Sequence, residues 1–332
     1  LYVVEGPYLV EVTLEDGTTT KFDSWFSAFT SSTAQYNNAT VTLLKDIETS
    51  TVVKTFATVT IDFNGHTLTV EQPENTAETA AITLLASSAR GTAHVTLKDS
   101  SEAANGGMKT VNVYGVTVKG SNTTLTIENG NYNCDTSVVQ VEKPASGVAT
   151  AYIKGGTFKT EDTDKRYLLN CIDEAYKAGT AVMEVTGGTF YGFDPSENPE
   201  GEGTTYVKVG YVVKKNGNNI YTVEESTAEA QIVGTQSFGT LTDMLAQSAN
   251  GQTVALVNDA TVNNWYFAVA PGKTIDLNGN KLTVTGKLYS FGKVIDSTEG
   301  EGLLSVTDMA GSQLPKDNGY LPIKDGDGYR LY

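Results

Sequence analysis

TIDFNGHTLTV, at residues 60–70, sets the pattern for most of this chain. Threonine alternates with isoleucine, leucine or valine on both sides of an Asn-Gly pair, and such alternation is typical of β-strands with one buried face. The Asn-Gly pair supplies the positive φ angles of a tight turn at little steric cost. The stretch is therefore predicted to form a strand, a turn and a second strand.

The histidine in this stretch, His66, raises the alternative that the turn carries chemistry, because it lies close to an aspartate and could serve as a general base or a metal ligand. A second copy of the stretch, TIDLNGNKLTV at 274–284, has Asn280 in place of His66. The residues that persist are Asp62, Asn64 and Gly65 in the first copy and Asp276, Asn278 and Gly279 in the second. We therefore interpret Asn64–Gly65 and Asn278–Gly279 as structural turns.

Further matches extend the duplication. TVTLLKDI (40–47) recurs as TVALVNDA (253–260), and HVTLKDSSEA (94–103) is aligned with LLSVTDMAGS (303–312). Upstream of each copy, apolar residues share offsets that place them on one face of a short helix, at 22–29 in the first copy and 238–245 in the second. The sequence therefore predicts two units that share one architecture and begin with a short capping helix.

A shorter period lies inside the first unit. ENGNY (128–132), KGGTF (154–158) and TGGTF (186–190) each follow a predicted strand. Strand, glycine turn, aromatic residue and return describe one coil of a solenoid, in which each coil buries its apolar face only against its neighbours. We predict turns at Gly130, Gly156 and Gly188, and a core stack formed by Tyr132, Phe158 and Phe190.

Three segments with the pattern of β-hairpins punctuate the chain: YVVEGPYLVEV (2–12), YVVKKNGNNIYTV (211–223) and YLPIKDGDGYRLY (320–332). We expect residues 1–12 to be the hairpin that ends a preceding unit. The first unit is then 13–223 with its closing hairpin 211–223, and a second, smaller unit is 224–332 with its closing hairpin 320–332. Neighbouring domains of a longer chain are expected on this interpretation.

Together these segments resemble the right-handed parallel β-helix (pectate-lyase-like) repeat modules of gut bacterial surface proteins. Residues 167–213 are also similar to a segment of structural or fibre proteins of gut phages. The resemblance covers most of 20–223 and much of 227–308. It implies an all-β fold, namely a right-handed parallel β-helix (solenoid) of two tandem units with short capping helices and β-hairpins. It also implies an extracellular location, at a cell or virion surface, and brings no catalytic residues with it.

Composition excludes several classes of partner. The net charge of −16 and the presence of only three arginines argue against nucleic acid, which needs a basic surface. The chain contains no run of about 18 apolar residues, so no membrane-spanning helix is predicted. Its alternating start, LYVVEGPYLV, does not resemble a signal peptide. Cys134 and Cys171 have no metal-ligand spacing, and we interpret both as small apolar residues rather than a disulfide.

Two pairs of aspartates are candidates for catalysis. Asp62 with Asp99, or Asp276 with Asp308, would approach one another on adjacent coils, as glycoside hydrolysis requires. Each follows a strand and precedes turn residues, so an aspartate that caps its own turn is the simpler interpretation. No enzyme is predicted, and a polysaccharide lyase or glycoside hydrolase stays the alternative.

Two candidate binding sites remain. The loop YGFDPSENPEGEG (191–203) offers oxygen ligands suited to Ca²⁺ at Asp194, Glu197, Glu200 and Glu202, although it matches no calcium-loop signature and a solvated loop is favoured. NNWYF (263–267) carries consecutive aromatic residues, and in a strand at least one ring must face outward. We therefore predict carbohydrate contact at Trp265 and Tyr266.

These observations favour a non-catalytic structural and adhesive module of an extracellular surface protein, which presents a surface for glycan or host attachment. No cofactor is expected apart from the Ca²⁺ alternative. A phage fibre or capsid-decorating virion protein is the main alternative function, and it would favour a homotrimer. For the segment 164–179, a strand at 168–172 followed by a loop is favoured over a helix.

Overall fold

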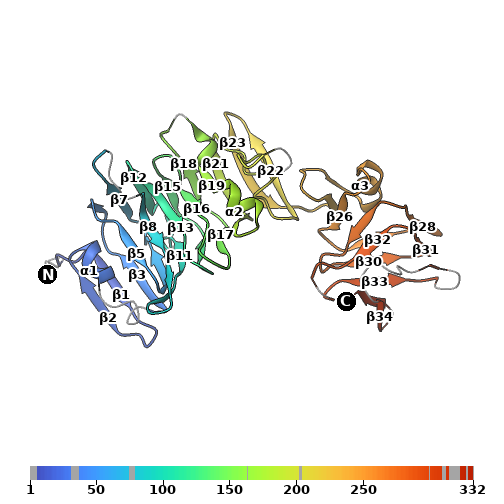
Figure 1. Cartoon of the computed structure of the whole chain (residues 1–332), viewed down its shortest axis with the longest axis horizontal. Helices are drawn as coiled ribbons and strands as arrows, with labels where there is room; N and C mark the ends of the chain where they lie inside the picture. The colour runs from blue at the N-terminus through green and yellow to red at the C-terminus, as the bar shows by residue number, and fades with distance from the viewer. Residues whose placement is uncertain are drawn as a thin grey trace. The chain divides into compact units, whose positions relative to one another are not determined.

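The computed structural model describes residues 6–30, 37–74, 79–162, 164–201, 204–298, 300–308, 312–313, 322–326 and 328–331. The chain divides into two compact units (Figure 1). The first comprises Leu1–Val207 and Val213–Glu224, and the second comprises Lys208–Val212 and Glu225–Tyr332. Strands are the main secondary structure of the described residues in both units, largely in parallel sheets, with a few short helices.

Three sheets build the first unit. The first sheet contains, in spatial order, β2 (Thr19–Phe22), β1 (Val10–Thr13), β3 (Ala39–Leu43), β6 (Thr58–Asp62), β11 (His94–Lys98), β14 (Thr124–Ile127), β17 (Ala149–Ile153) and β20 (Ala181–Val185). The second contains β22 (Tyr211–Asn216), β23 (Ile220–Glu225), β21 (Gly188–Tyr191), β18 (Thr157–Lys159), β15 (Asn131–Asn133), β12 (Gly107–Val111), β7 (Thr67–Glu71) and β4 (Ile47–Thr49). The third contains β19 (Leu169–Cys171), β16 (Val139–Val141), β13 (Tyr114–Val118), β8 (Ala80–Leu84) and β5 (Val53–Thr55).

From β3 onward, successive strands enter the first, second and third sheet in rotation, and each strand pairs in parallel with the strand one rotation earlier. We call one such rotation of the chain through the sheets a coil. One insertion breaks this path, a short antiparallel pair of β9 (Ala86–Ser87) and β10 (Gly91–Thr92) before β11. The parallel register aligns buried aliphatic residues across the first sheet: Val41, Ile61, Leu97, Ile127, Ile153 and Val185. The alternation of threonine and aliphatic residues therefore places one face of each strand in the core.

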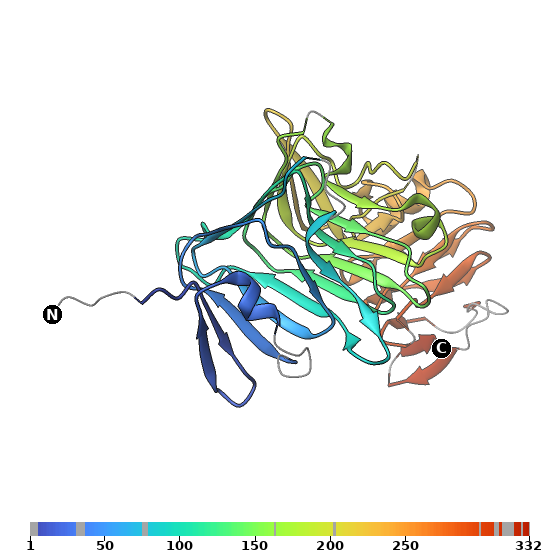
Figure 2. The same ribbon diagram turned by 60° about the vertical axis from the view of Figure 1, so that its left-hand side comes forward.

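Antiparallel elements lie at both ends of the first unit (Figure 2). At its start, β1 pairs antiparallel with β2 and with β3, and α1 (Trp25–Thr30) follows β2. At its end, β23 pairs antiparallel with β21, and β22 lies beside β23. The last rotation also contains η1 (Lys165–Tyr167) and α2 (Asp173–Lys177).

Three local predictions need correction. Residues 1–5 of the predicted hairpin 1–12 lie outside the described part, and Val10–Thr13 pairs antiparallel with Thr19–Phe22 and with Ala39–Leu43 of the first unit. The first helix begins at Trp25, because Phe22 still belongs to a strand. The predicted strand near 168–172 is present as β19, but a helical turn, α2, follows it where a loop was predicted. Asp173 and Glu174 occupy the first turn of α2, where acidic residues favour helix.

The second unit repeats this plan on a smaller scale. Its first sheet contains β25 (Phe238–Gly239), β24 (Ala230–Ile232), β26 (Thr253–Leu256), β29 (Thr274–Asp276) and β32 (Lys293–Ile295). Its second contains β27 (Ala260–Val262), β30 (Lys281–Val284), β33 (Leu303–Val306), β35 (Gly328–Leu331) and β34 (Pro322–Asp325), and its third contains β28 (Tyr266–Val269) and β31 (Lys287–Ser290). An antiparallel pair, β24 and β25, with α3 (Leu241–Gln247) opens the unit, and β34–β35 pairs antiparallel onto β33.

The predicted alignment of 94–103 with 303–312 is wrong. Strand β33 lies in the second sheet of its unit, whereas β11 lies in the first sheet of the other unit. The counterpart of β11 is β32, which pairs with β29 as β11 pairs with β6. The second unit has no insertion equivalent to β9–β10 in this rotation, so the rotation is shorter. A simple sequence match therefore skips β32 and aligns β11 with β33.

Candidate functional site

The duplicated Asn-Gly turns form hydrogen bonds to the neighbouring coils on both sides. Asn64 and Gly65 have φ angles of 49° and 80°, and Asn278 and Gly279 have nearly the same values, 46° and 78°. Each asparagine donates from its side chain to a carbonyl of the preceding coil, Leu43 at 3.1 Å or Leu256 at 3.0 Å. In the first copy His66 lies beside the turn, with Nδ1 3.4 Å from Asp46. The polar atoms of the turns are thus engaged in holding coils together.

A buried aspartate in the next coil accepts a hydrogen bond from each turn. Asp99 accepts hydrogen bonds from the amides of Gly65 at 2.7 Å and Gly106 at 2.7 Å. Asp296 accepts from the amides of Gly279, Thr298, Gly300 and Gly302 and from the Thr298 hydroxyl. Burial by itself would raise the pKa of both aspartates, but these hydrogen bonds outweigh it and hold the pKa below the ordinary value.

The carboxylates considered as catalytic pairs therefore serve in the turns. Asp62 accepts from the amides of Asn64 and Ser100, at 3.0 Å each, and lies 3.7 Å from the ammonium of Lys98. In the second unit the residue equivalent to Asp99 is Asp296, not Asp308, which is exposed at the end of β33. This corrects the predicted pairing of Asp276 with Asp308.

The three predicted core rings stack along the second sheet of the first unit. Tyr132 and Phe158 have ring centroids 5.3 Å apart with an interplanar angle of 9°, and Phe158 and Phe190 are 4.9 Å apart at 10°. All three are at most 1% exposed. The glycines that precede them, Gly130, Gly156 and Gly188, have φ angles of 107–112°, which an L side chain rarely adopts.

Among the described residues of the acidic loop after β21, Asp194, Glu197 and Glu200 do not converge on one site. Asp194 accepts from the amide and hydroxyl of Ser196, and Glu197 is exposed. Glu200 points instead into the interior, is 4% exposed and accepts from the Tyr206 hydroxyl at 2.9 Å. Glu202 lies outside the described residues. Within the described part of the chain, no group of three or more His, Cys, Asp or Glu residues is placed to hold a metal ion.

The buried Glu200 predicts a pH-dependent stability. Its Oε2 has no hydrogen-bond partner, and burial raises its pKa above 4.5, an effect that outweighs the hydrogen bond from Tyr206. Because the folded state holds this proton more tightly than the unfolded chain, the contribution of Glu200 to stability is full below pH 4.5 and is lost as pH rises through the folded pKa.

Glu200→Gln, which mimics the protonated form, is expected to raise the melting temperature at pH 7 by about 2–4 °C, as about 1 kcal/mol would in a unit of this size. At pH 4 the variant and the parent should melt together, as followed by circular dichroism. Equal shifts at the two pH values would show that the charge of Glu200 is not the cause.

The cysteines are buried thiols. The described structure has both Cys134 and Cys171 free, and burial raises the pKa of each to about 12. Val139 pairs with Leu169, and Val141 pairs with Cys171, so Cys171 lies in register with core aliphatic residues. Both thiols are therefore poor nucleophiles at neutral pH.

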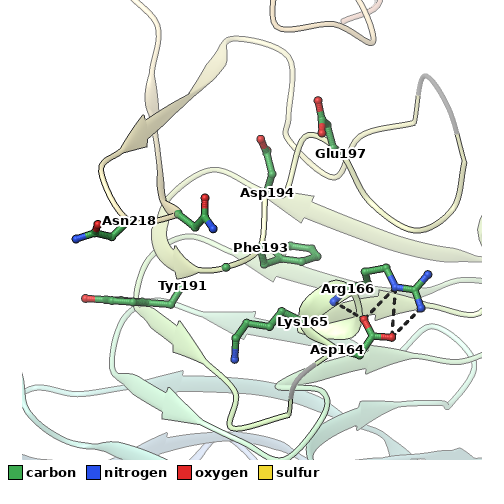
Figure 3. A pocket seen from close by; sticks show the side chains of 10 residues that line it. Asp164, Lys165, Arg166, Tyr191, Phe193, Asp194, Glu197 and Asn218 are labelled. Carbon is green, nitrogen blue, oxygen red and sulfur yellow. Dashed lines mark hydrogen bonds and ion pairs between the residues drawn. The ribbon is translucent and has the colours of Figure 1, made fainter.

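A pocket of about 740 Å³ lies near the end of the first unit (Figure 3). It is formed by η1 and the preceding residue, by the segment after β21, and by the turn between β22 and β23, so we name it the hairpin-end pocket. Its lining residues are Asp164, Lys165, Arg166, Tyr191, Gly192, Phe193, Asp194, Glu197, Asn218 and Asn219. Of the predicted loop residues, Asp194 and Glu197 line it and Glu200 does not.

The second unit carries an exposed row of rings. Trp265 is 83% exposed and precedes β28, and within β28 the strand alternation turns Tyr266 outward, at 42% exposed, and Phe267 inward. The ring centroids of Trp265 and Tyr266 are 5.6 Å apart, and those of Tyr266 and Tyr289 are 5.1 Å apart. We name Trp265, Tyr266 and Tyr289 the aromatic platform.

Tyr289 and most of the hairpin-end pocket were not predicted. Tyr289 joins the platform because β28 and β31 pair in parallel, with Ala268 opposite Tyr289. The outward positions of KLYS (287–290) could have signalled it, since Lys287 and Tyr289 alternate with buried residues. The pocket is formed by three segments, and no local sequence pattern predicts that they lie close together.

None of the helices formed by the described residues has both the length and the apolar character that a membrane crossing needs. Comparisons of this chain with known protein families, with curated proteins and with solved structures found no match.

Proposed function

We propose that the chain is a right-handed parallel β-helix of two tandem units, related to the repeat modules that its sequence resembles. The rotation of successive strands among three sheets and the parallel register between rotations support this proposal. The antiparallel hairpins that begin and end each unit would cover the exposed backbone groups of the terminal coils.

The function that this scaffold supports best is non-catalytic adhesion to glycans by an extracellular protein. The observation that carries this proposal is the aromatic platform. A tryptophan that is 83% exposed costs solubility without contributing to the core, and exposed apolar groups of this kind mark interaction sites. Ring faces in a row offer stacking surfaces for the C–H faces of successive sugar rings, while Lys287, opposite Tyr266 in the register, adds a hydrogen-bond donor.

Trp265→Ala is expected to reduce glycan affinity more than tenfold, because truncation of an aromatic residue that dominates a binding surface costs about 2 kcal/mol. The measurement is retardation of the full chain in native gels that contain mannan, β-glucan, xylan or galactan. Phe26→Ala is the matched control, since Phe26 is a 57% exposed ring on α1 in the other unit. If Trp265→Ala migrated like the parent chain in every gel that retards the parent, the platform would not be the binding surface.

Tryptophan emission gives an independent readout. The chain has two tryptophans, Trp25, which is 1% exposed, and Trp265. A sugar stacked on Trp265 should shift its emission to shorter wavelength and protect it from acrylamide, with saturation. The alternative of a polysaccharide lyase or glycoside hydrolase predicts new reducing ends or unsaturated products in the same incubations. The alternative of a phage fibre predicts a trimer mass by light scattering.

A further inference from the structure

We propose that the hairpin-end pocket is a second ligand site, which takes a short neutral oligosaccharide independently of the aromatic platform. The choice of a carbohydrate rests on the proposed function; the existence of the site does not. The pocket belongs wholly to the first unit, and its volume of about 740 Å³ lies in the range of small-ligand sites.

The walls of the pocket carry both donors and acceptors of hydrogen bonds (Figure 3). Arg166 and Asp164 form a bidentate pair, with Nη2 2.7 Å from one carboxylate oxygen and Nε 2.9 Å from the other. The amide of Asn218 and the exposed carboxylate of Glu197 line other parts of the pocket. A sugar hydroxyl both donates and accepts, so walls that mix guanidinium, carboxylate and amide groups suit a polyhydroxylated ligand.

The charge of the lining argues against a strongly ionic ligand. Three acidic and two basic side chains line the pocket, and Asp164 and Arg166 are paired with each other. The ammonium of Lys165 donates to the carbonyls of Thr160 at 2.6 Å and Asp162 at 3.0 Å. The lining therefore offers neither an anion nor a cation a surface of only the opposite charge. A neutral ligand does not need such a surface.

An aromatic ring borders the same pocket. Tyr191 lines it, and the ammonium of Lys159 lies 4.3 Å from the centroid of that ring. Lys159 is not among the lining residues of this pocket, so its ammonium does not add to the charge of the lining. An aromatic ring at the edge of a pocket offers a stacking partner for a sugar.

The backbone holds these groups in place before any ligand arrives. Asn218 and Asn219 adopt φ angles of 63° and 56°, and the carbonyl of Asn219 accepts from the amide of Gly192 at 2.7 Å. A Cβ atom at Gly192 would lie 2.5 Å from Cδ of Lys165, so glycine allows the lysine stem to cross here. A preformed site loses less conformational entropy on binding.

The test places a fluorescent reporter in the pocket. Tyr191→Trp keeps a ring at this position, and Trp265→Phe in the same chain removes the exposed tryptophan of the second unit, leaving buried Trp25 as a constant background. Titration with short neutral oligosaccharides of mannose, glucose, xylose and galactose is expected to give a saturable blue shift with at least one of them. Tyr152→Trp with Trp265→Phe is the matched control, because Tyr152 is outward-facing on β17 of the same unit.

Adding Asn218→Gly to the Tyr191→Trp reporter should weaken binding by roughly tenfold, because it removes one amide while glycine tolerates the positive φ. A silent Tyr191→Trp reporter with every oligosaccharide, or an equal response from Tyr152→Trp, would overturn the pocket as a site. Failure of the proposed function has a different signature, namely loss of the Trp265→Ala effect in gels while the Tyr191→Trp reporter still responds.

Discussion

Asp296→Ala is expected to lower the free energy of unfolding of the second unit by about 3–5 kcal/mol, because it strands several buried amides at once. The Asp296 side chain is fully buried. Its oxygens accept from the amides of Gly279 at 3.0 Å, Gly300 at 3.0 Å and Gly302 at 2.7 Å. Alanine supplies no acceptor, so these amides lose the group around which they converge.

Urea unfolding, followed by hydrogen exchange of the amides in 274–306, should show this lower free energy of unfolding. Asp308→Ala is the matched control, since Asp308 is exposed, and its cost should stay within about 0.5 kcal/mol. Equal costs for the two variants would contradict the role assigned to Asp296. The lowered pKa of Asp296 gives a second signature. Its contribution to stability is present above the unfolded pKa and is lost as pH falls through the folded pKa, so the difference between parent and variant should shrink in acid.

Phe158→Ala is expected to cost the first unit about 3–5 kcal/mol, because it removes the middle ring of a three-ring stack and leaves a cavity. Phe158 is fully buried and contacts Tyr132 on one side and Phe190 on the other. Neighbouring coils cannot close the gap, since parallel strands hold the flanking rings at fixed spacing. The emission of buried Trp25 during urea unfolding reports on this unit.

Tyr152→Ala provides the control for ring removal, because Tyr152 lies on the preceding strand, β17, but is 36% exposed. Its cost should be far smaller than that of Phe158→Ala. If the two variants unfolded at the same urea concentration, the stack would contribute nothing beyond an ordinary surface ring. The same pair of variants should leave glycan retardation unchanged, since neither residue belongs to the aromatic platform.

Local chemistry was enough to predict the strands, the turns and the ring stack. Threonine alternating with aliphatic residues marks strands with one buried face, and Asn64–Gly65 recurs as Asn278–Gly279 because few other residues tolerate these φ angles. Glycine followed by an aromatic residue at each coil placed Tyr132, Phe158 and Phe190 in one column. These features depend on neighbours within a few residues, so the local sequence is enough to predict them.

Contacts between coils were beyond the reach of such patterns. Parallel pairing joins residues that are a whole coil apart, and coil length differs between the units, so Asp308 was matched where Asp296 belongs. The burial of Glu200, the addition of Tyr289 to the platform and the three-segment pocket arise in the same way. Each of these features depends on which distant segment packs against it. The register of the sheets determines that neighbour, whereas the conformational preference of a single residue does not.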